Sequence, residues 1–123
     1  MPKVLVADDD KNVVEMVQRA LSDRGFTVVT ATDGVEALEL MEKDLPDLLI
    51  LDIAMTRLDG YTIATRLRDD PKTSLLPVII ITARSQMQTF LHQHPNVKAF
   101  LEKPFNPLQL VEIAAGLVGG KKI

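Results

Sequence analysis

The sequence predicts an α/β protein with a doubly wound, five-stranded parallel sheet and five helices. Two uninterrupted aliphatic runs, residues 48–51 and 78–81, are typical of strands buried on both faces of a parallel sheet. Three shorter apolar or β-branched segments complete the set of strands, and helical patterns separate them. Short connections and right-handed crossovers leave few topologies for this alternation.

The composition indicates one ordinary globular domain over residues 1–123. The net charge is −3, 46% of the residues are hydrophobic and 25% are charged, so the chain lacks the basic character of a nucleic-acid-binding domain. The absence of cysteine excludes disulfides, thiolate catalysis and Cys-ligated zinc. No apolar run approaches the length of a membrane span, and Met1 leads almost directly into a strand rather than a signal peptide. We therefore expect a cytoplasmic protein with no membrane contact.

The first two predicted strands are each followed by a well-marked helix. Asp10 is placed to cap the first helix, and Gly25 ends it. Asp33 and Glu36 have the spacing of a capping box at the start of the second helix. The four elements are expected at residues 3–7, about 12–24, 27–31 and 33–43.

The second half of the chain continues the alternation. Asp59-Gly60 marks a turn and a helix start directly after the long central strand. Asn106-Pro107 begins the last helix, with proline in its first turn, and Gly119-Gly120 ends it. The segment before His94-Pro95 is at most a weak helix. These elements are expected at residues 48–52, 60–68, 78–82, 85–92, 99–101 and from 106 onward.

Reactive polar side chains follow four of the five predicted strands. Asp8 and Asp9 follow the first strand, Asp52 the third, Thr82 the fourth and Lys103 the fifth. Because the carboxyl ends of parallel strands meet at one edge of the sheet, we expect these side chains to lie together. Such a carboxylate cluster suits Mg²⁺, beside which Asp52 could act as a nucleophile toward phosphorus and form an aspartyl phosphate. The Thr82 hydroxyl and the Lys103 ammonium would stabilise charge on the transferred group.

Each of these residues taken alone has a simpler explanation. Asp52 could cap its loop, Thr82 could be a turn residue and Lys103 a solvated lysine. Asp8, Asp9 and Asp10 could form a turn and a helix cap. The combination is what carries information, because every polar group sits at the end of a predicted strand.

Four segments of the sequence carry a resemblance to a known family. Residues 4–10, 51–60, 77–83 and 100–105 resemble the receiver domains of two-component response regulators, and the similarity extends over nearly the whole chain. The resemblance implies a flavodoxin-like fold with strand order 2-1-3-4-5. It also implies a signalling phosphoacceptor rather than an enzyme, one that catalyses only its own phosphorylation and slow dephosphorylation. A sensor histidine kinase or a phosphotransfer protein would supply the phosphoryl group to Asp52, and a downstream effector protein or domain would receive the signal.

The resemblance also assigns the metal ligands. Asp9 and Asp52 would bind Mg²⁺ together with the backbone carbonyl of Ala54, and Asp8 would help through water.

Further roles follow for residues near the phosphoryl group. Thr82 and Lys103 would contact it, and Phe100 matches the aromatic switch position that moves when Thr82 is drawn toward the phosphate. The bond between Lys103 and Pro104 is expected to be a cis peptide, which only an X-Pro bond adopts at low cost.

Three features depart from the family pattern. Thr56 stands where proline is usual, so the loop after Asp52 is expected to be less rigid. Residues 92–98 replace the usual Gly-Ala turn and indicate a shortened fourth helix. Ala54 and Arg84 fill positions that tune phosphoryl hydrolysis, and because Ala54 cannot hydrogen-bond an attacking water we expect a long-lived phosphoform.

Two other features allow more than one interpretation. His92 and His94 are expected in an exposed loop, the alternative being a metal or phosphorelay role. The last helix has an unusually wide apolar face, which either packs in the core or forms a partner surface in a monomer or weak dimer. That face comprises Leu108, Leu110, Val111, Ile113, Ala114, Ala115, Leu117 and Val118.

Two other classes of protein remain as alternatives to a phosphoacceptor. Asp8 and Asp10 have the Asp-x-Asp spacing of haloacid-dehalogenase-type phosphohydrolases, but Asn12 stands where that family has threonine or valine, and the chain has no room for a cap domain. A receiver that is never phosphorylated and acts only as a binding scaffold is the other alternative.

Overall fold

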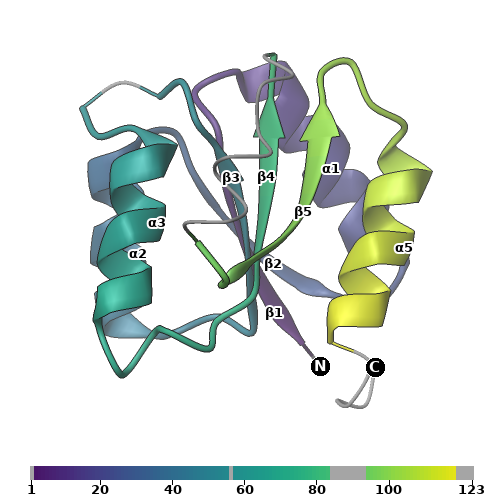
Figure 1. The fold of residues 1–123 in the computed structure, drawn as a ribbon. Helices are drawn as coiled ribbons and strands as arrows, with labels where there is room; N and C mark the ends of the chain where they lie inside the picture. The colour runs from purple at the N-terminus through teal and green to yellow at the C-terminus, as the bar shows by residue number, and fades with distance from the viewer. Residues whose placement is uncertain (1, 56, 84–93, 119–123) are drawn as a thin grey trace.

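A single five-stranded parallel sheet lies at the centre of the molecule, between two layers of helices (Figure 1). The computed structural model describes residues 2–55, 57–83 and 94–118. The sheet order is β2-β1-β3-β4-β5, which confirms the predicted fold class and topology. The strands are β1 (Lys3–Ala7), β2 (Thr27–Ala31), β3 (Leu48–Asp52), β4 (Val78–Thr82) and β5 (Val97–Glu102).

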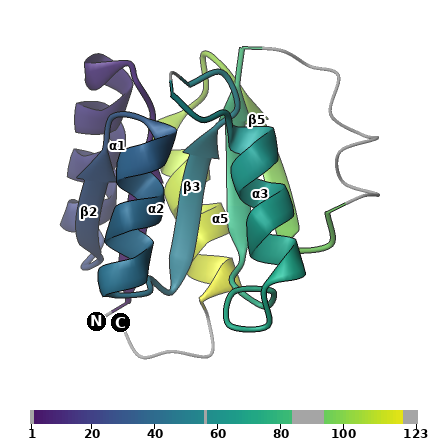
Figure 2. The same cartoon turned by 90° about the vertical axis from the view of Figure 1, so that its left-hand side faces the viewer.

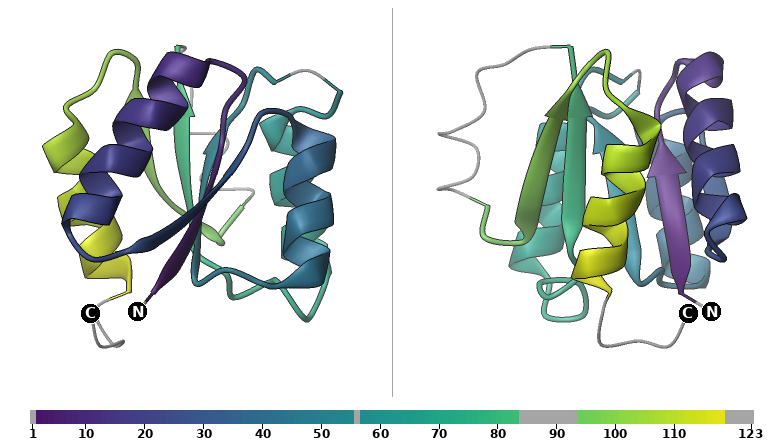
Figure 3. Two further views of the ribbon diagram at one scale, coloured as in Figure 1. Left: turned by 180° about the vertical axis from the view of Figure 1, so that it is seen from behind. Right: turned by 90° about the vertical axis from the view of Figure 1, so that its right-hand side faces the viewer.

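Helices cover both faces of the sheet, as Figures 2 and 3 show from opposite sides. Helices α2 (Gly34–Lys43) and α3 (Gly60–Asp69) cover one face, and α1 (Lys11–Asp23) and α5 (Pro107–Leu117) cover the other. Within the described residues there are therefore four helices rather than the expected five. The segment 85–92, where the additional helix was expected, lies outside the described residues, as do Thr56, Arg84 and Gly119-Gly120.

The predicted helix starts are confirmed by their capping hydrogen bonds. In each case a side-chain oxygen accepts a hydrogen bond from a backbone N–H of the first turn, which would otherwise lack a partner. The four caps are Asp10 to Asn12 at 2.9 Å, Asp33 to Glu36 at 2.9 Å, Asp59 to Thr62 at 2.7 Å and Asn106 to Leu108 at 2.9 Å. The predicted cis peptide between Lys103 and Pro104 is also present.

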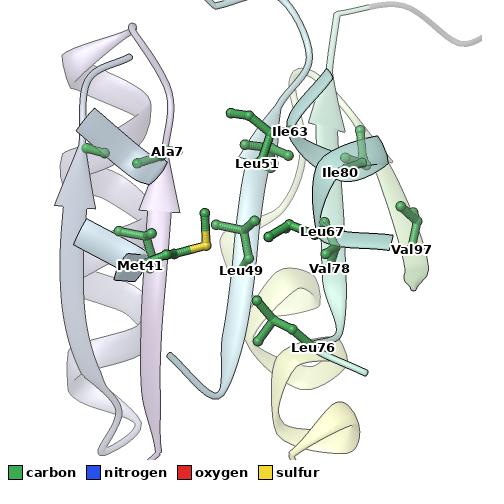
Figure 4. Packing of buried hydrophobic residues seen from close by; sticks show 14 of the residues in the cluster. Ala7, Met41, Leu49, Leu51, Ile63, Leu67, Leu76, Val78, Ile80 and Val97 are labelled. Atoms are coloured by element: carbon green, nitrogen blue, oxygen red, sulfur yellow. The ribbon is translucent and has the colours of Figure 1, made fainter. Parts of the chain in front are cut away.

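The central strands β3 and β4 are buried on both faces, which explains their continuous aliphatic sequences. Alternate residues face opposite helix layers. Leu49, Leu51, Val78 and Ile80 pack with side chains of α2 and α3 (Figure 4). Their neighbours Leu48, Ile50, Ile79 and Ile81 pack with side chains of α1 and α5. Each fully buried side chain of this size contributes about 1.5–3 kcal/mol to folding, so the two layers fix the sheet firmly.

The wide apolar face of α5 is mainly a core surface. Leu110, Val111 and Ala114 are buried against the sheet, which confirms the packing interpretation for these residues. Leu108 is 70% exposed at the start of the helix. The apolar pattern of residues 12–24 predicts Met16 on the inner face of α1, but this residue is also exposed, at 38%.

The prediction that His94 lies in an exposed loop is wrong, because the side chain is fully buried. Its Nε2 lies 2.8 Å from Oγ1 of Thr65, and its ring meets the ring of Tyr61 edge-to-face at a centroid distance of 4.9 Å. Both contacts come from α3, so tertiary packing encloses the histidine. His92 lies outside the described residues.

Candidate functional site

The polar strand ends meet at one edge of the sheet, at the top of Figure 1. Ala7 of β1 is paired with Leu51 of β3, so Asp8 and Asp52 occupy matching positions one residue further along. Because side chains alternate along a strand, Asp8 and Asp52 continue the rows that face α1 and α5. The sheet register thus places two carboxylates side by side.

Three carboxylates and one ammonium group converge at this edge. One oxygen each from Asp8, Asp9 and Asp52 lies within 4.8 Å of the others. Nζ of Lys103 is 2.7 Å from Oδ2 of Asp8 and 3.3 Å from Oδ2 of Asp52. Asp8 and Asp52 are buried, whereas Asp9 is exposed. The predicted cluster of Asp8, Asp9, Asp52 and Lys103 is therefore present in the structure.

The electrostatics of the cluster reflect its burial. Burial, followed by the negative charge of Asp8, raises the pKa of Asp52 above its usual value, and Lys103 only partly opposes this. Burial alone would lower the pKa of Lys103, but the short contact with Asp8 and the negative charges of both carboxylates outweigh it and raise that pKa. Two carboxylates that share one ammonium group retain negative charge for a further cation.

The donor set fits a hard divalent cation. Carboxylate oxygens are the ligands that Mg²⁺ prefers, and Asp9 leaves one side of the cluster open to solvent. Oδ2 of Asp8 is buried, and its contact among the described residues is the ion pair with Lys103 rather than a well-directed hydrogen bond. The backbone N–H of Ala54 donates to Oδ1 of Asp52 at 3.3 Å, which places Ala54 next to the carboxylate.

Thr82 and Phe100 lie on the two strands that border the cluster. Thr82 is buried at the end of β4, and its carbonyl oxygen accepts a hydrogen bond from the backbone N–H of Lys103 at 2.7 Å. Phe100 is half-buried on β5 opposite Ile80 and packs against the core beneath α2 and α3. The predicted switch pair therefore occupies neighbouring strands.

The β3–α3 loop, residues 53–59, is held by hydrogen bonds at the end of β3 and by an ion pair with the start of α2. The backbone N–H groups of Met55 and Gly60 both donate to the carbonyl of Ile53, at 3.0 and 2.9 Å. A Cβ at Gly60 would lie 2.5 Å from the carbonyl oxygen of Asp52, so the start of α3 requires glycine at this point. Arg57 reaches back to form an ion pair with Asp33 at 2.8 Å.

The pairing of Asp33 with Arg57 is not evident from the sequence. The sequence predicts Asp33 only as a helix cap and indicates no function for Arg57. The two residues are 24 positions apart, and no periodic pattern links them. An arginine close to the acidic strand end was the one available signal.

A comparison with family models matches residues 4–115 to the response regulator receiver domain. Among curated proteins, the response regulator MprA of Mycobacterium ulcerans (strain Agy99) is 41% identical over 104 residues. The match covers 84% of this chain and 44% of the relative, so the chain spans less than half the length of that relative.

Solved structures give the same picture. A putative response regulator from Chloroflexus aurantiacus J-10-fl is 34% identical with a TM-score of 0.86, and the match covers 96% of this chain and 98% of that one. The response regulator TrrA of Thermotoga maritima, solved in complex with Mg²⁺-BeF, is 32% identical with a TM-score of 0.84, and the match covers 95% of this chain and 99% of that one. No helix in the described part of this chain is long and apolar enough to cross a membrane.

Proposed function

The chain belongs to the response regulator receiver domain family of two-component signalling, and on this basis we propose that Asp52 is its phosphoacceptor. In this proposal residues 1–123 act as one receiver domain. The protein is a signalling phosphoacceptor that promotes its own phosphorylation and slow dephosphorylation. Mg²⁺ is the proposed cofactor.

The convergence of Asp8, Asp9 and Lys103 on Asp52 is the observation that supports this proposal most strongly. A capping residue has no need of two further carboxylates and a partly buried ammonium. A nucleophilic carboxylate does need them, because the transferring phosphoryl group carries negative charge that cations must balance.

The proposed reaction is a single phosphoryl transfer. A carboxylate oxygen of Asp52 forms a bond to phosphorus as the P–N bond of the donor's phosphohistidine breaks, and the electron pair of that bond stays on the imidazole nitrogen. Bound Mg²⁺ would neutralise charge on the phosphoryl oxygens. Lys103 lies within reach of the carboxylate that accepts the group, and its positive charge favours the product.

The remaining residues take the following proposed roles. Asp9, Asp52 and the backbone carbonyl of Ala54 hold the metal, with Asp8 assisting through water. The Thr82 hydroxyl binds a phosphoryl oxygen, and Phe100 moves in response as part of the output switch. The position of Phe100 on β5, beside the strand that ends in Thr82, supports this pairing.

The proposed partners are a sensor histidine kinase or phosphotransfer protein and a downstream effector protein or domain. The edge of the sheet that carries Asp8, Asp9 and Asp52 is called the acidic edge. Any phosphoryl donor must approach Asp52 from the solvent side of this edge. A shallow hollow between α1 and the start of α5 is lined by Met16 and Leu108, whose partly exposed apolar side chains suit a protein partner there. We expect no direct nucleic-acid binding by this domain, because its net charge is −3.

Intact mass measurement after incubation with acetyl phosphate tests the proposal. We expect one phosphoryl adduct that requires both Mg²⁺ and Asp52 and is absent from Asp52→Asn. No adduct under any condition would contradict phosphoacceptor function and favour a scaffold. Continuous release of inorganic phosphate would favour a phosphohydrolase instead.

The same samples test the lifetime of the phosphoform. Because the Ala54 side chain offers no hydrogen bond to an attacking water, we expect the adduct to decay slowly after acetyl phosphate is removed. Complete loss within seconds would contradict this part of the proposal. The partner assignment is tested separately, by transfer from a purified phosphorylated histidine kinase.

A further inference from the structure

We propose that Asp33 and Arg57 form an ionic latch that fixes the β3–α3 loop to the start of α2 and so positions the backbone of Ala54 beside Asp52. Both are positioning residues, because neither contacts Asp52 itself. The benefit of the latch for Mg²⁺ binding rests on the function proposed above, whereas its effect on the loop is independent of that function.

The contact between the two side chains is directional. Nε of Arg57 donates to Oδ2 of Asp33 at 3.0 Å, and Nη2 donates to Oδ1 at 3.0 Å. Two parallel hydrogen bonds fix the planes of the guanidinium and the carboxylate relative to each other. A lysine at position 57 could supply the charge but not this fixed geometry.

The backbone of Arg57 adopts a conformation that the ion pair helps to maintain. Its φ angle is 67°, in the left-handed region that residues with a Cβ rarely adopt. Such a conformation persists where surrounding contacts determine it. The side chain of Arg57 is 58% exposed, so packing contributes little and the contact with Asp33 is the principal restraint on the side chain.

Asp33 is a rigid point of attachment. It caps α2 by accepting from the backbone N–H of Glu36, and Glu36 in turn accepts from the backbone N–H of Thr32 at 2.7 Å. A Cβ on Gly34 would collide with the carbonyl oxygen of Leu58, so the loop backbone rests directly on the first turn of α2. Hydrogen bonds from the Glu36 N–H and from Arg57 hold the pKa of Asp33 below its usual value, and the carboxylate is therefore ionised at neutral pH.

The opposite end of the loop connects to the phosphoacceptor. Met55 and Gly60 both donate to the carbonyl of Ile53, which ties the loop base to the end of β3. Ala54 lies between Ile53 and Arg57 in the sequence, and its backbone N–H donates to Oδ1 of Asp52. The latch adds a restraint on this segment from outside the loop, through the first turn of α2.

The experiment compares Asp33→Asn, Arg57→Gln and the double variant with the unmodified protein. Asparagine caps helices as well as aspartate does, so Asp33→Asn removes the ion pair while keeping the cap. Glu112→Gln is the matched control, because it breaks an exposed ion pair with Arg24 at 2.8 Å between α1 and α5, away from the loop.

Two readouts are needed. The first is amide hydrogen exchange at Met55 and Gly60 without Mg²⁺, with Ile50 in the core as reference. The second is the Mg²⁺ dissociation constant from calorimetry. For each single variant we expect exchange at Met55 and Gly60 to rise, and Mg²⁺ binding to weaken, by about two- to fivefold, the range of a partly exposed ion pair. The double variant should show no further change, and Glu112→Gln none.

Several outcomes would overturn the latch. One is unchanged exchange at Met55 and Gly60 in both single variants. Another is an equal increase at Ile50, which would reveal general destabilisation. Failure of the unmodified protein to bind Mg²⁺ would instead contradict the proposed function, while the exchange data would still decide whether the latch holds the loop.

Discussion

Nζ of Lys103 lies closer to Asp8, at 2.7 Å, than to the expected phosphoacceptor Asp52, at 3.3 Å. Lys103 thus partly neutralises two buried carboxylates, and its side chain is itself only 21% exposed. Its predicted role was contact with a phosphoryl group. The geometry adds a structural role, because without the ammonium the carboxylates would repel each other in a poorly solvated site.

Replacement of Lys103 by methionine is therefore expected to destabilise the protein. The free energy of unfolding in urea without Mg²⁺ should fall by about 1–3 kcal/mol, somewhat less than for a fully buried pair because Lys103 retains some solvent contact. Lys98→Met is the matched control, since Lys98 is an exposed lysine on β5, the strand that Lys103 directly follows. Equal stability of Lys103→Met and the unmodified protein would show that Asp8 and Asp52 do not depend on this cation.

Asp52→Asn is expected to stabilise the protein at neutral pH in the absence of Mg²⁺. Burial and the charge of Asp8 raise the pKa of Asp52, which means that folding disfavours its ionised form. A neutral amide of the same shape removes that penalty, so the free energy of unfolding should rise. Urea denaturation at pH 7 measures the difference, and a loss of stability would contradict the expectation.

The pH dependence of that difference has a definite sign. The folded protein binds the Asp52 proton more tightly than the unfolded chain, so ionisation of Asp52 reduces stability as pH rises from its unfolded pKa through its raised folded pKa. The stability advantage of Asp52→Asn should therefore be largest at pH 7 and disappear toward about pH 4. Denaturation curves for both proteins across this range test the trend, and an advantage that grows with acidity would contradict it.

Mg²⁺ is expected to stabilise the folded protein through the same cluster. At 100 times its dissociation constant, a ligand that binds only the folded state adds about 2.7 kcal/mol to the free energy of unfolding. Asp9→Asn should abolish most of this gain while leaving the metal-free stability nearly unchanged, because Asp9 is exposed. Asp23→Asn, an exposed aspartate at the end of α1, is the control. An equal gain in Asp9→Asn would exclude Asp9 as a ligand.

Gly34→Ala is expected to destabilise the protein through a backbone clash. The added methyl group would meet the carbonyl of Leu58, and relieving the contact must move either α2 or the β3–α3 loop. We expect a loss of about 1–3 kcal/mol. Gly116→Ala in α5 is the control, because a Cβ there meets nothing within 4 Å and should stabilise the helix by about 0.5–1 kcal/mol. Thermal or urea unfolding of both variants gives the comparison.

The acidic edge could be predicted from the sequence because strand ends are local features. Asp8, Asp52 and Lys103 each follow a recognisable apolar run, and parallel pairing brings such ends together whatever the details of packing. The register that pairs Ala7 with Leu51 then decides how closely the carboxylates approach. That register follows from burial of alternate residues on both faces of the sheet.

Contacts between elements distant in the sequence could not be predicted in the same way. Pro95 and Asn96 beside His94 suggested an exposed turn, yet Thr65 and Tyr61 of α3 enclose the histidine ring. Asp33 and Arg57 form a contact because the connection from β2 through α2 to β3 places the start of α2 next to the β3–α3 loop. No spacing pattern in the sequence predicts such contacts, because they depend on how the helices pack against the folded sheet.

The start of β1 and the end of α5 lie at the same end of the molecule, opposite the carboxyl ends of the strands (Figure 1). The two ends of the described chain are therefore suitable points for attaching a label, a surface or another protein. A fluorescent reporter, a sensor surface or a second polypeptide joined near Lys3 or near Leu117 would stand away from Asp52. Such conjugates should leave the acidic edge accessible to solvent and to a docking protein.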